Sequence, residues 1–144
     1  MKAHRSDNTL ELSLPSTFEA LEWLVEVADG FFSEFYKDDD LVYRLVLLTS
    51  EATTNAVEHG NKFNPDLRAE VRLTAHDNEA TIQVTDQGVG FSRQNVADPL
   101  SKERLAAERG RGVFLMESMA DEAKWDDEGR RVRLTVRIAP TPRG

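Results

Sequence analysis

The sequence contains no cysteine and no apolar run near the roughly 18 residues that a membrane-spanning helix needs. Disulfides are therefore excluded. The three histidines, His4, His59 and His76, do not have the spacing of metal ligands, so a structural zinc site is not expected. No apolar segment near the start has the pattern of a signal peptide. We expect a cytoplasmic protein.

Positive charge is also scarce, with 18 Lys and Arg against 26 Asp and Glu, for a formal net charge of -8. Direct nucleic-acid binding is not expected, because it depends on clustered Lys and Arg opposite phosphates. Basic protein surfaces are the more natural partners. The length of 144 residues and the apolar content of 40% are enough for one core, so we expect a single domain spanning residues 1–144.

Apolar periodicity predicts the order of helices and strands, while the polar residues 1–8 are expected to be loose. A capping-box pattern at Ser16–Glu19 and the acidic residues 38–40 indicate the starts of the first two helices. In chain order, the expected elements are a strand at 9–14, helices at 18–36 and 41–59, strands at 68–75 and 80–85, a helix at 113–120, and strands at 123–125 and 131–138. This order predicts an α+β two-layer sandwich, with a mixed, mostly antiparallel sheet and helices on one face.

The helix expected at 41–59 has polar side chains opposite its apolar face. Glu51, Asn55 and Glu58 follow each other at i, i+4 and i+7, which in an α-helix places them within an arc of about 60°, with His59 at its edge. A carboxylate beside a carboxamide on a rigid support suits a metal-nucleotide site. The solvated face of a surface helix is the ordinary alternative.

Two glycine clusters follow. In the first, Asp86–Gly90 (DQGVG), a carboxylate directly after a strand suits acceptance from a ligand N–H while the backbone approaches a flat ring; a hairpin or bulge is the alternative. The second, Arg109–Gly112 (RGRG), stands before the last expected helix, where backbone N–H groups can receive phosphate oxygens. A hinge is its alternative. The long polar segment between them is typical of a lid, which we assign to about residues 92–109.

In this order the motifs ExxxN, DxGxG and GxG before a helix resemble the GHKL (Bergerat-fold) ATP-binding domains, and among them the small stand-alone anti-sigma factor serine/threonine kinases. Residues 51–59 match the N box of that family, 86–90 its G1 box and 110–117 its G2 region. Chain length and element order fit over nearly the whole sequence. The departures lie in the lid, which does not align, and in Arg111 between the two G2 glycines.

The resemblance implies a role for each matching residue. Asn55 is similar to the Mg²⁺ ligand, Glu51 to the catalytic base, and Asp86 to the residue that binds the adenine amino group. The other residues implied in nucleotide binding are His59, Gly88, Gly90, Gly110, Arg111, Gly112 and Val113. The implied cofactors are ATP and Mg²⁺.

The function implied by the resemblance is an ATP-dependent serine/threonine protein kinase that acts as an anti-sigma factor. Its implied partners are a sigma factor and an anti-anti-sigma (STAS-type) antagonist that it phosphorylates; a homodimer is left open. One alternative is a nucleotide-responsive protein-binding module with little or no phosphoryl transfer. Glu51 favours the enzyme, because a pure binder needs no base beside its metal ligand. A sensor histidine kinase half, or a repair-type or chaperone-type ATPase, is disfavoured because no phosphoacceptor helix precedes the domain and no transducer domain follows it.

Overall fold

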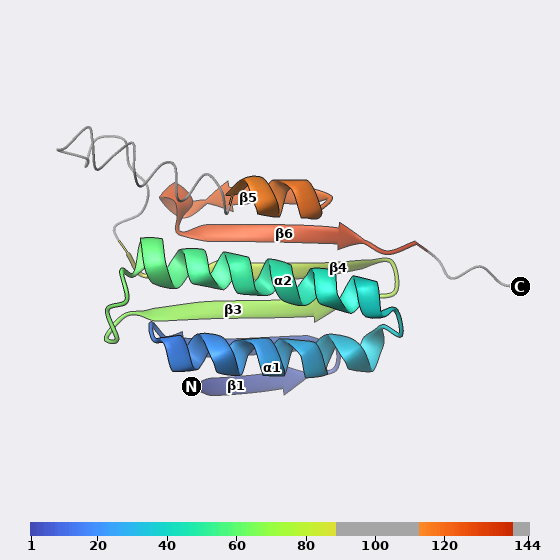
Figure 1. Cartoon of the computed structure of the whole chain (residues 1–144), viewed down its shortest axis with the longest axis horizontal. Helices are drawn as coiled ribbons and strands as arrows, with labels where there is room; N and C mark the ends of the chain where they lie inside the picture. The colour runs from blue at the N-terminus through green and yellow to red at the C-terminus, as the bar shows by residue number, and fades with distance from the viewer. Residues whose placement is uncertain (89–112, 140–144) are drawn as a thin grey trace, which may run out of the picture.

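A six-stranded sheet with the strand order β1-β2-β3-β4-β6-β5 forms the frame of the molecule (Figure 1). The structure is a computed structural model and describes residues 1–88 and 113–139. The strands are β1 Lys2–Ser6, β2 Thr9–Pro15, β3 Arg68–Ala75, β4 Glu79–Thr85, β5 Glu122–Asp126 and β6 Arg131–Arg137. All neighbours in this sheet pair antiparallel.

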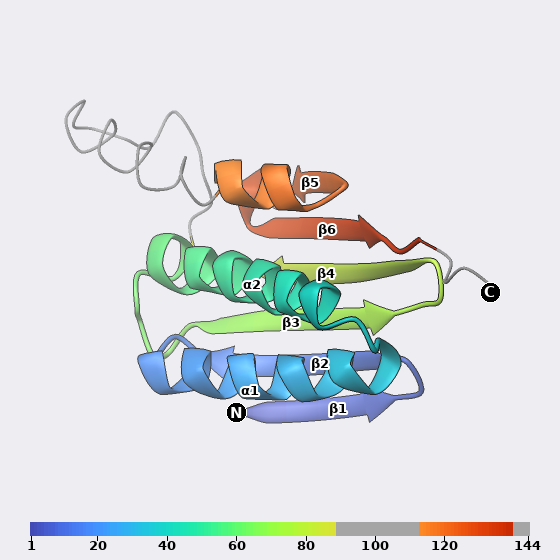
Figure 2. The same cartoon turned by 45° about the vertical axis from the view of Figure 1, so that its right-hand side comes forward.

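The helices lie together on one face of the sheet. They are α1 Phe18–Phe35, α2 Asp39–Asn55 with the π-helical turn η1 Ala56–Gly60 at its end, and a helix whose described residues are 113–119. Figures 1 and 2 show α1 in front of β2, with the edge strand β1 beside it, and α2 in front of β3 and β4. The predicted α+β sandwich with helices on one face is therefore confirmed, but the described strands form an antiparallel sheet and not a mixed one. Within the described ranges, no helix combines the length and the apolarity needed to cross a bilayer.

Alternating side chains of the central strands form the core. Leu73 of β3 lies opposite Ile82 of β4, which in turn lies opposite Leu134 of β6, and all three are fully buried. Leu45, Leu48 and Ala52 of α2 are buried in the same cluster. Burying one such large apolar side chain stabilises the fold by about 1.5–3 kcal/mol. The packing of α2 onto this cluster holds the helix that carries Glu51 and Asn55.

The starts of the two helices test the predicted caps. Asp38 caps α2 as predicted, since its Oδ1 accepts from the backbone N–H of Asp40 at 3.0 Å and of Leu41 at 3.2 Å. The capping box predicted from Ser16 is one residue early: Thr17 is the N-cap of α1 and accepts from the N–H of Ala20 at 3.2 Å. Ser16 is instead buried, and its hydroxyl donates to the carbonyl of Leu67 at 2.8 Å.

The prediction that residues 1–8 are loose is wrong. Residues 2–6 form β1, which pairs along β2 with Ala3 opposite Leu12. The guanidinium of Arg5 lies 5.0 Å from the ring centre of Phe31 and is 2.6 Å from a carboxylate oxygen of Glu34, so β1 is also tied to α1. All five residues of β1 are exposed. An edge strand without a buried face has no apolar alternation, so periodicity does not reveal it.

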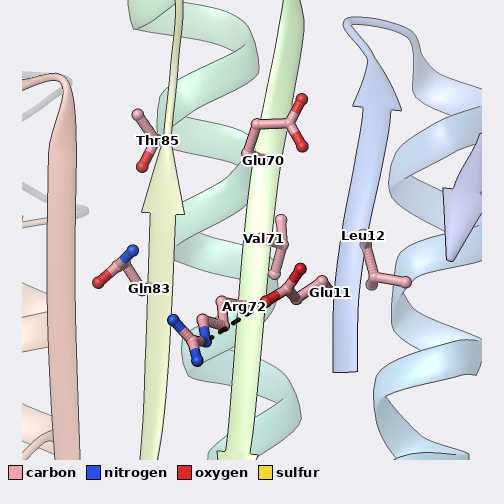
Figure 3. A pocket seen from close by; sticks show the side chains of 7 residues that line it. All are labelled: Glu11, Leu12, Glu70, Val71, Arg72, Gln83 and Thr85. Atoms are coloured by element: carbon pink, nitrogen blue, oxygen red, sulfur yellow. Dashed lines mark ion pairs between the residues drawn. The ribbon is translucent and has the colours of Figure 1, made fainter. Parts of the chain in front are cut away.

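Charge is distributed unevenly between the two layers. The sequence of α1 has five acidic residues and no Lys or Arg. The opposite, open face of the sheet carries both signs, as in the shallow pocket of Figure 3, where Arg72 points to Glu11 with 3.7 Å between Nε and Oε1. Both side chains are more than half exposed, so this ion pair contributes at most about 1 kcal/mol.

Candidate functional site

The end of α2 carries the first part of the candidate site. Glu51 and Asn55 follow one another by one helical turn, and Glu51 is half-buried whereas Asn55 is only 7% exposed. The side-chain oxygen of Asn55 is buried without a hydrogen-bond partner among the described residues. A buried acceptor left unsatisfied costs about 1–3 kcal/mol, so it is rare unless a ligand or ion completes it.

The chain changes its winding directly after Asn55. Ala56–Gly60 is a π-helical turn, which the N–H of Asn61 closes by donating to the carbonyl of Ala56 at 2.8 Å. The prediction of one α-helix through His59 is wrong here, and the 60° arc derived from α-helical spacing does not extend to Glu58 or His59. Glu58 is exposed and His59 is half-buried. π-turns are frequent at functional sites, where they insert one extra residue into a helix.

The π-turn brings the end of α2 against the Asp86–Gly88 loop that follows β4. Asp86 is 5% exposed, and its Oδ1 accepts from the N–H of Gly88 at 2.9 Å. A Cβ added to Gly60 would collide with the carboxylate of Asp86, and one added to Gly88 would collide with the carbonyl of Gly60. Only glycine permits this close approach. Two motifs that are separate in the sequence are therefore joined at Gly60.

Asn61 fastens this loop from one side. It is buried, and its Oδ1 accepts from the N–H of Gln87 at 2.9 Å. Its Nδ2 donates to the hydroxyl of Ser16 and to the carbonyl of Arg68, each at 3.0 Å. The sequence prediction did not single out Asn61, because a buried Asn in a loop has no periodic signal and its partners are distant in sequence.

Arg130, from the turn between β5 and β6, fastens the loop from the other side. Its Nε donates to the carbonyl of Gly88 at 2.8 Å, and its own carbonyl accepts from the N–H of Asp86 at 2.9 Å. Arg130 is likewise not predicted from the sequence. It lies 42 positions beyond its partner Gly88, and nothing in the spacing of the motifs points to it.

The other predicted residues are only partly described. Val113 is half-buried at the first described position of the helix at 113–119. The predicted lid at 92–109 lies outside the described residues, as do four of the predicted nucleotide contacts: Gly90, Gly110, Arg111 and Gly112. The described residues thus bring together the Glu51–Asn55 pair, the π-turn and the Asp86–Gly88 loop.

The side-chain oxygen of Asn55 fits a Mg²⁺ site in which phosphate and water oxygens supply most of the ligands. Mg²⁺ prefers oxygen ligands and is commonly bound in phosphate sites by one or two protein groups. In the part of the chain that the structure describes, no group of three or more His, Cys, Asp or Glu residues is placed to hold a metal. The buried, unpartnered Oδ1 of Asn55 is an oxygen of the required type.

Residues 14–136 match the histidine kinase-like ATPase domain. A serine-protein kinase RsbW of Bacillus licheniformis is 30% identical over 138 residues, which cover 91% of this chain and 86% of that protein. An anti-sigma F factor of Clostridium acetobutylicum is 30% identical over 134 residues, covering 91% and 93%. An anti-sigma F factor of Bacillus subtilis is 26% identical over 115 residues, covering 76% and 79%. The matched range runs from β2 to β6 and includes both the end of α2 and the Asp86–Gly88 loop.

Proposed function

Since the chain belongs to the histidine kinase-like ATPase domain family, we propose that it is an ATP-dependent serine/threonine protein kinase that acts as an anti-sigma factor. In this role it binds a sigma factor and phosphorylates a small anti-anti-sigma protein in the control of transcription. Some relatives that match most of the chain are named serine-protein kinase and others anti-sigma F factor, and both groups support the proposal. We also propose a cytoplasmic location, which this role requires, and a single domain. A homodimer is left open.

The observation that carries the proposal is the buried, unpartnered oxygen of Asn55 one turn after Glu51. Asn55 would hold Mg²⁺ through this oxygen. When bound, the ion neutralises charge on the phosphates during transfer. Glu51 would accept the proton of the attacking serine hydroxyl, since it carries a carboxylate on the same helix one turn before Asn55.

Asp86 would bind the base end of the nucleotide. Its carboxylate is a hydrogen-bond acceptor of the type that the adenine amino group needs, and the Gly88 amide holds it in one orientation. Gly60 and Gly88 keep side chains away from this contact. The proposal also includes the predicted nucleotide contacts at His59 and Val113 and at the four positions outside the described residues: Gly90, Gly110, Arg111 and Gly112.

A nucleotide-responsive binding module with little or no transfer is the disfavoured alternative. A carboxylate beside the metal ligand has a use in proton transfer but none in nucleotide binding alone, where its charge opposes that of the phosphates. The relatives that bear the name serine-protein kinase also favour the enzyme.

The test is transfer of label to a partner. Proteins captured by the chain in the presence and absence of ATP are incubated with it, Mg²⁺ and γ-labelled ATP, and Glu51→Gln serves as the matched control. We expect label on a serine or threonine of a small captured protein with the wild type and a large loss with the variant. Capture that depends on ATP without transfer to any partner would replace the kinase with the binding module.

A further inference from the structure

The Asp86–Gly88 loop is fastened through the backbone N–H groups of all three residues and through the carbonyl of Gly88. On the side of η1, the N–H of Gln87 donates to Asn61, and the side-chain oxygen of Gln87 accepts from the N–H of Arg68 at 2.6 Å. On the side of the β5–β6 turn, Arg130 bonds the N–H of Asp86 at 2.9 Å and the carbonyl of Gly88 at 2.8 Å. The loop is therefore hydrogen-bonded on both sides, to the end of η1 and to the β5–β6 turn, which are far apart in the sequence.

The guanidinium of Arg130 is itself held in one orientation. Its Nη1 lies 3.2 Å from the carbonyl oxygen of Asp127, 3.5 Å from the carboxylate of Asp127 and 3.6 Å from that of Glu128. The Arg130 side chain is 25% exposed, against 52% and 69% for the two acids. Since Arg presents several N–H groups in a rigid plane, anchoring Nη1 on the turn aims Nε at Gly88.

The turn that presents Arg130 is strained. Asp127 and Glu128 have φ of 51° and 57°, in the left-handed region, and Gly129 follows at 86°. For residues with a side chain this conformation costs about 1–2 kcal/mol each. Such strain persists where the surrounding contacts require it, and here the turn places both the carbonyl and the side chain of Arg130 on the loop.

We infer that Arg130 is a positioning residue which fixes the Asp86–Gly88 loop and thereby sets the preference for a 6-aminopurine nucleotide over a 6-oxopurine nucleotide. This inference rests on the proposed function, in which Asp86 binds the base. A carboxylate attracts the amino group of adenine and repels the oxygen of guanine, and both effects depend on a fixed distance. Arg130 donates to the carbonyl of Gly88, and the N–H of Gly88 donates to the carboxylate of Asp86. Arg130 therefore keeps the Asp86 carboxylate in its orientation through Gly88.

The experiment compares Arg130→Ala and Arg130→Lys with Arg131→Ala as the matched control. Arg131 is the next residue, its Nε donates to the hydroxyl of Thr85 at 3.2 Å, and it pairs with Asp126 at 3.8 Å. Calorimetric titration with Mg-ATP and with Mg-GTP measures the selectivity ratio, and thermal unfolding without nucleotide measures stability. Phosphoryl transfer at saturating ATP supplies kcat.

For Arg130→Ala we expect the affinity for Mg-ATP to fall about tenfold, because a charged hydrogen bond to the loop is lost. Affinity for Mg-GTP should change less, so the ATP-to-GTP ratio falls, while kcat stays within about threefold. Arg130→Lys keeps the positive charge, but its single ammonium cannot bond both Gly88 and Asp127 as the planar guanidinium does. We therefore expect an ATP-to-GTP ratio between those of the wild type and Arg130→Ala. Arg131→Ala should leave the ratio unchanged.

The outcomes separate the inference from the function on which it rests. A wild type that binds no ATP overturns the proposed function and this inference with it. If the wild type binds ATP with selectivity but both Arg130 variants keep the same ratio, the inference fails and the proposed function stands. Equal weakening of ATP and GTP would assign Arg130 a structural role only. If Arg130→Ala does not fold, the ratio measured with Arg130→Lys decides.

Discussion

The two ends of the candidate site differ in how their polar groups are satisfied. At the Asp86–Gly88 end, the protein itself supplies a partner to the N–H groups of all three residues and to the carbonyl of Gly88. At the α2 end, the buried oxygen of Asn55 has none among the described residues. The first end is thus preformed, whereas the second retains a buried acceptor that a ligand or ion can satisfy.

This difference gives the two ends different effects on the free energy of ligand binding. A preformed loop loses little conformational freedom when a ligand binds, so its hydrogen bonds contribute fully to affinity. An unsatisfied buried acceptor lowers the stability of the ligand-free protein by about 1–3 kcal/mol, which binding recovers. Changes in the loop should therefore alter affinity and base preference, and changes on α2 should alter metal dependence and transfer.

The largest expected effect is on transfer by Glu51→Gln. Gln keeps the size and an oxygen acceptor but cannot take the hydroxyl proton, so transfer at saturating ATP should fall by about 10²–10⁴ while ATP binds within a few fold of the wild type. Labelled-phosphate transfer and calorimetry measure the two quantities. Near-normal transfer would remove Glu51 as the base and leave positioning alone to explain catalysis.

Asp86→Asn breaks the preformed end. The carboxamide can turn an N–H toward the adenine amino group, and the charge-assisted bond is lost, which costs about 1.5–3 kcal/mol, or roughly ten- to a hundredfold in ATP affinity. Calorimetric titration is the measurement, and circular dichroism checks that the fold is intact. Unchanged affinity in a folded variant would contradict the assignment of Asp86 to the base.

Asn55→Ala should sharpen the contrast between the ends. We expect Mg-ATP affinity to fall about tenfold, and chelation of Mg²⁺ to weaken binding strongly in the wild type but little in the variant. The ligand-free variant should lose no more than about 1 kcal/mol of stability, because removing an unsatisfied acceptor offsets the lost packing. Titrations with and without EDTA, together with urea unfolding, test this. Equal sensitivity of both proteins to EDTA would exclude Asn55 as the ligand.

Thr17→Ala is the smallest change and should affect neither end. Losing the N-cap of α1 costs about 1 kcal/mol, or about 2–4 °C in Tm for a chain of this size. Thermal unfolding measures the loss, and Thr17→Ser, which keeps a capping hydroxyl, is the control. A change in ATP affinity would show that the start of α1 is coupled to the loop through the neighbouring Ser16, whose hydroxyl bonds Asn61.

The sandwich and most of its elements could be predicted because their apolar side chains alternate or recur at helical spacing. β1 could not, because its residues are all exposed and it is held by pairing and by the contacts of Arg5. The π-turn was also missed. Its buried residues Ala56 and Val57 fit an α-helical pattern equally well, and close packing of Gly60 against Asp86 accompanies the different winding.

Prediction reached the motif residues of the site but not the residues that hold them. Glu51, Asn55 and Asp86 follow from spacing, from position after a strand, and from the resemblance that spacing suggests, and their roles stay predictions. Asn61 and Arg130 lie 26 and 42 residues from the loop groups that they bond. The Arg130 contact depends on the sheet bringing β4 beside β6, and the Asn61 contact depends on the end of α2 and η1 packing against the sheet. No local pattern encodes either.

The acidity of α1 has a consequence for the speed of association. Glu34 is paired with Arg5 of β1, but the helix has no Lys or Arg to neutralise its other four carboxylates. One side of the helical layer therefore has an excess of negative charge, whose potential extends about 8 Å into solution at physiological ionic strength. A cationic surface that diffuses nearby is steered into contact before any short-range bond forms. The association rate with such a surface would then fall steeply as salt is added, while the dissociation rate would depend mainly on the contacts made after docking.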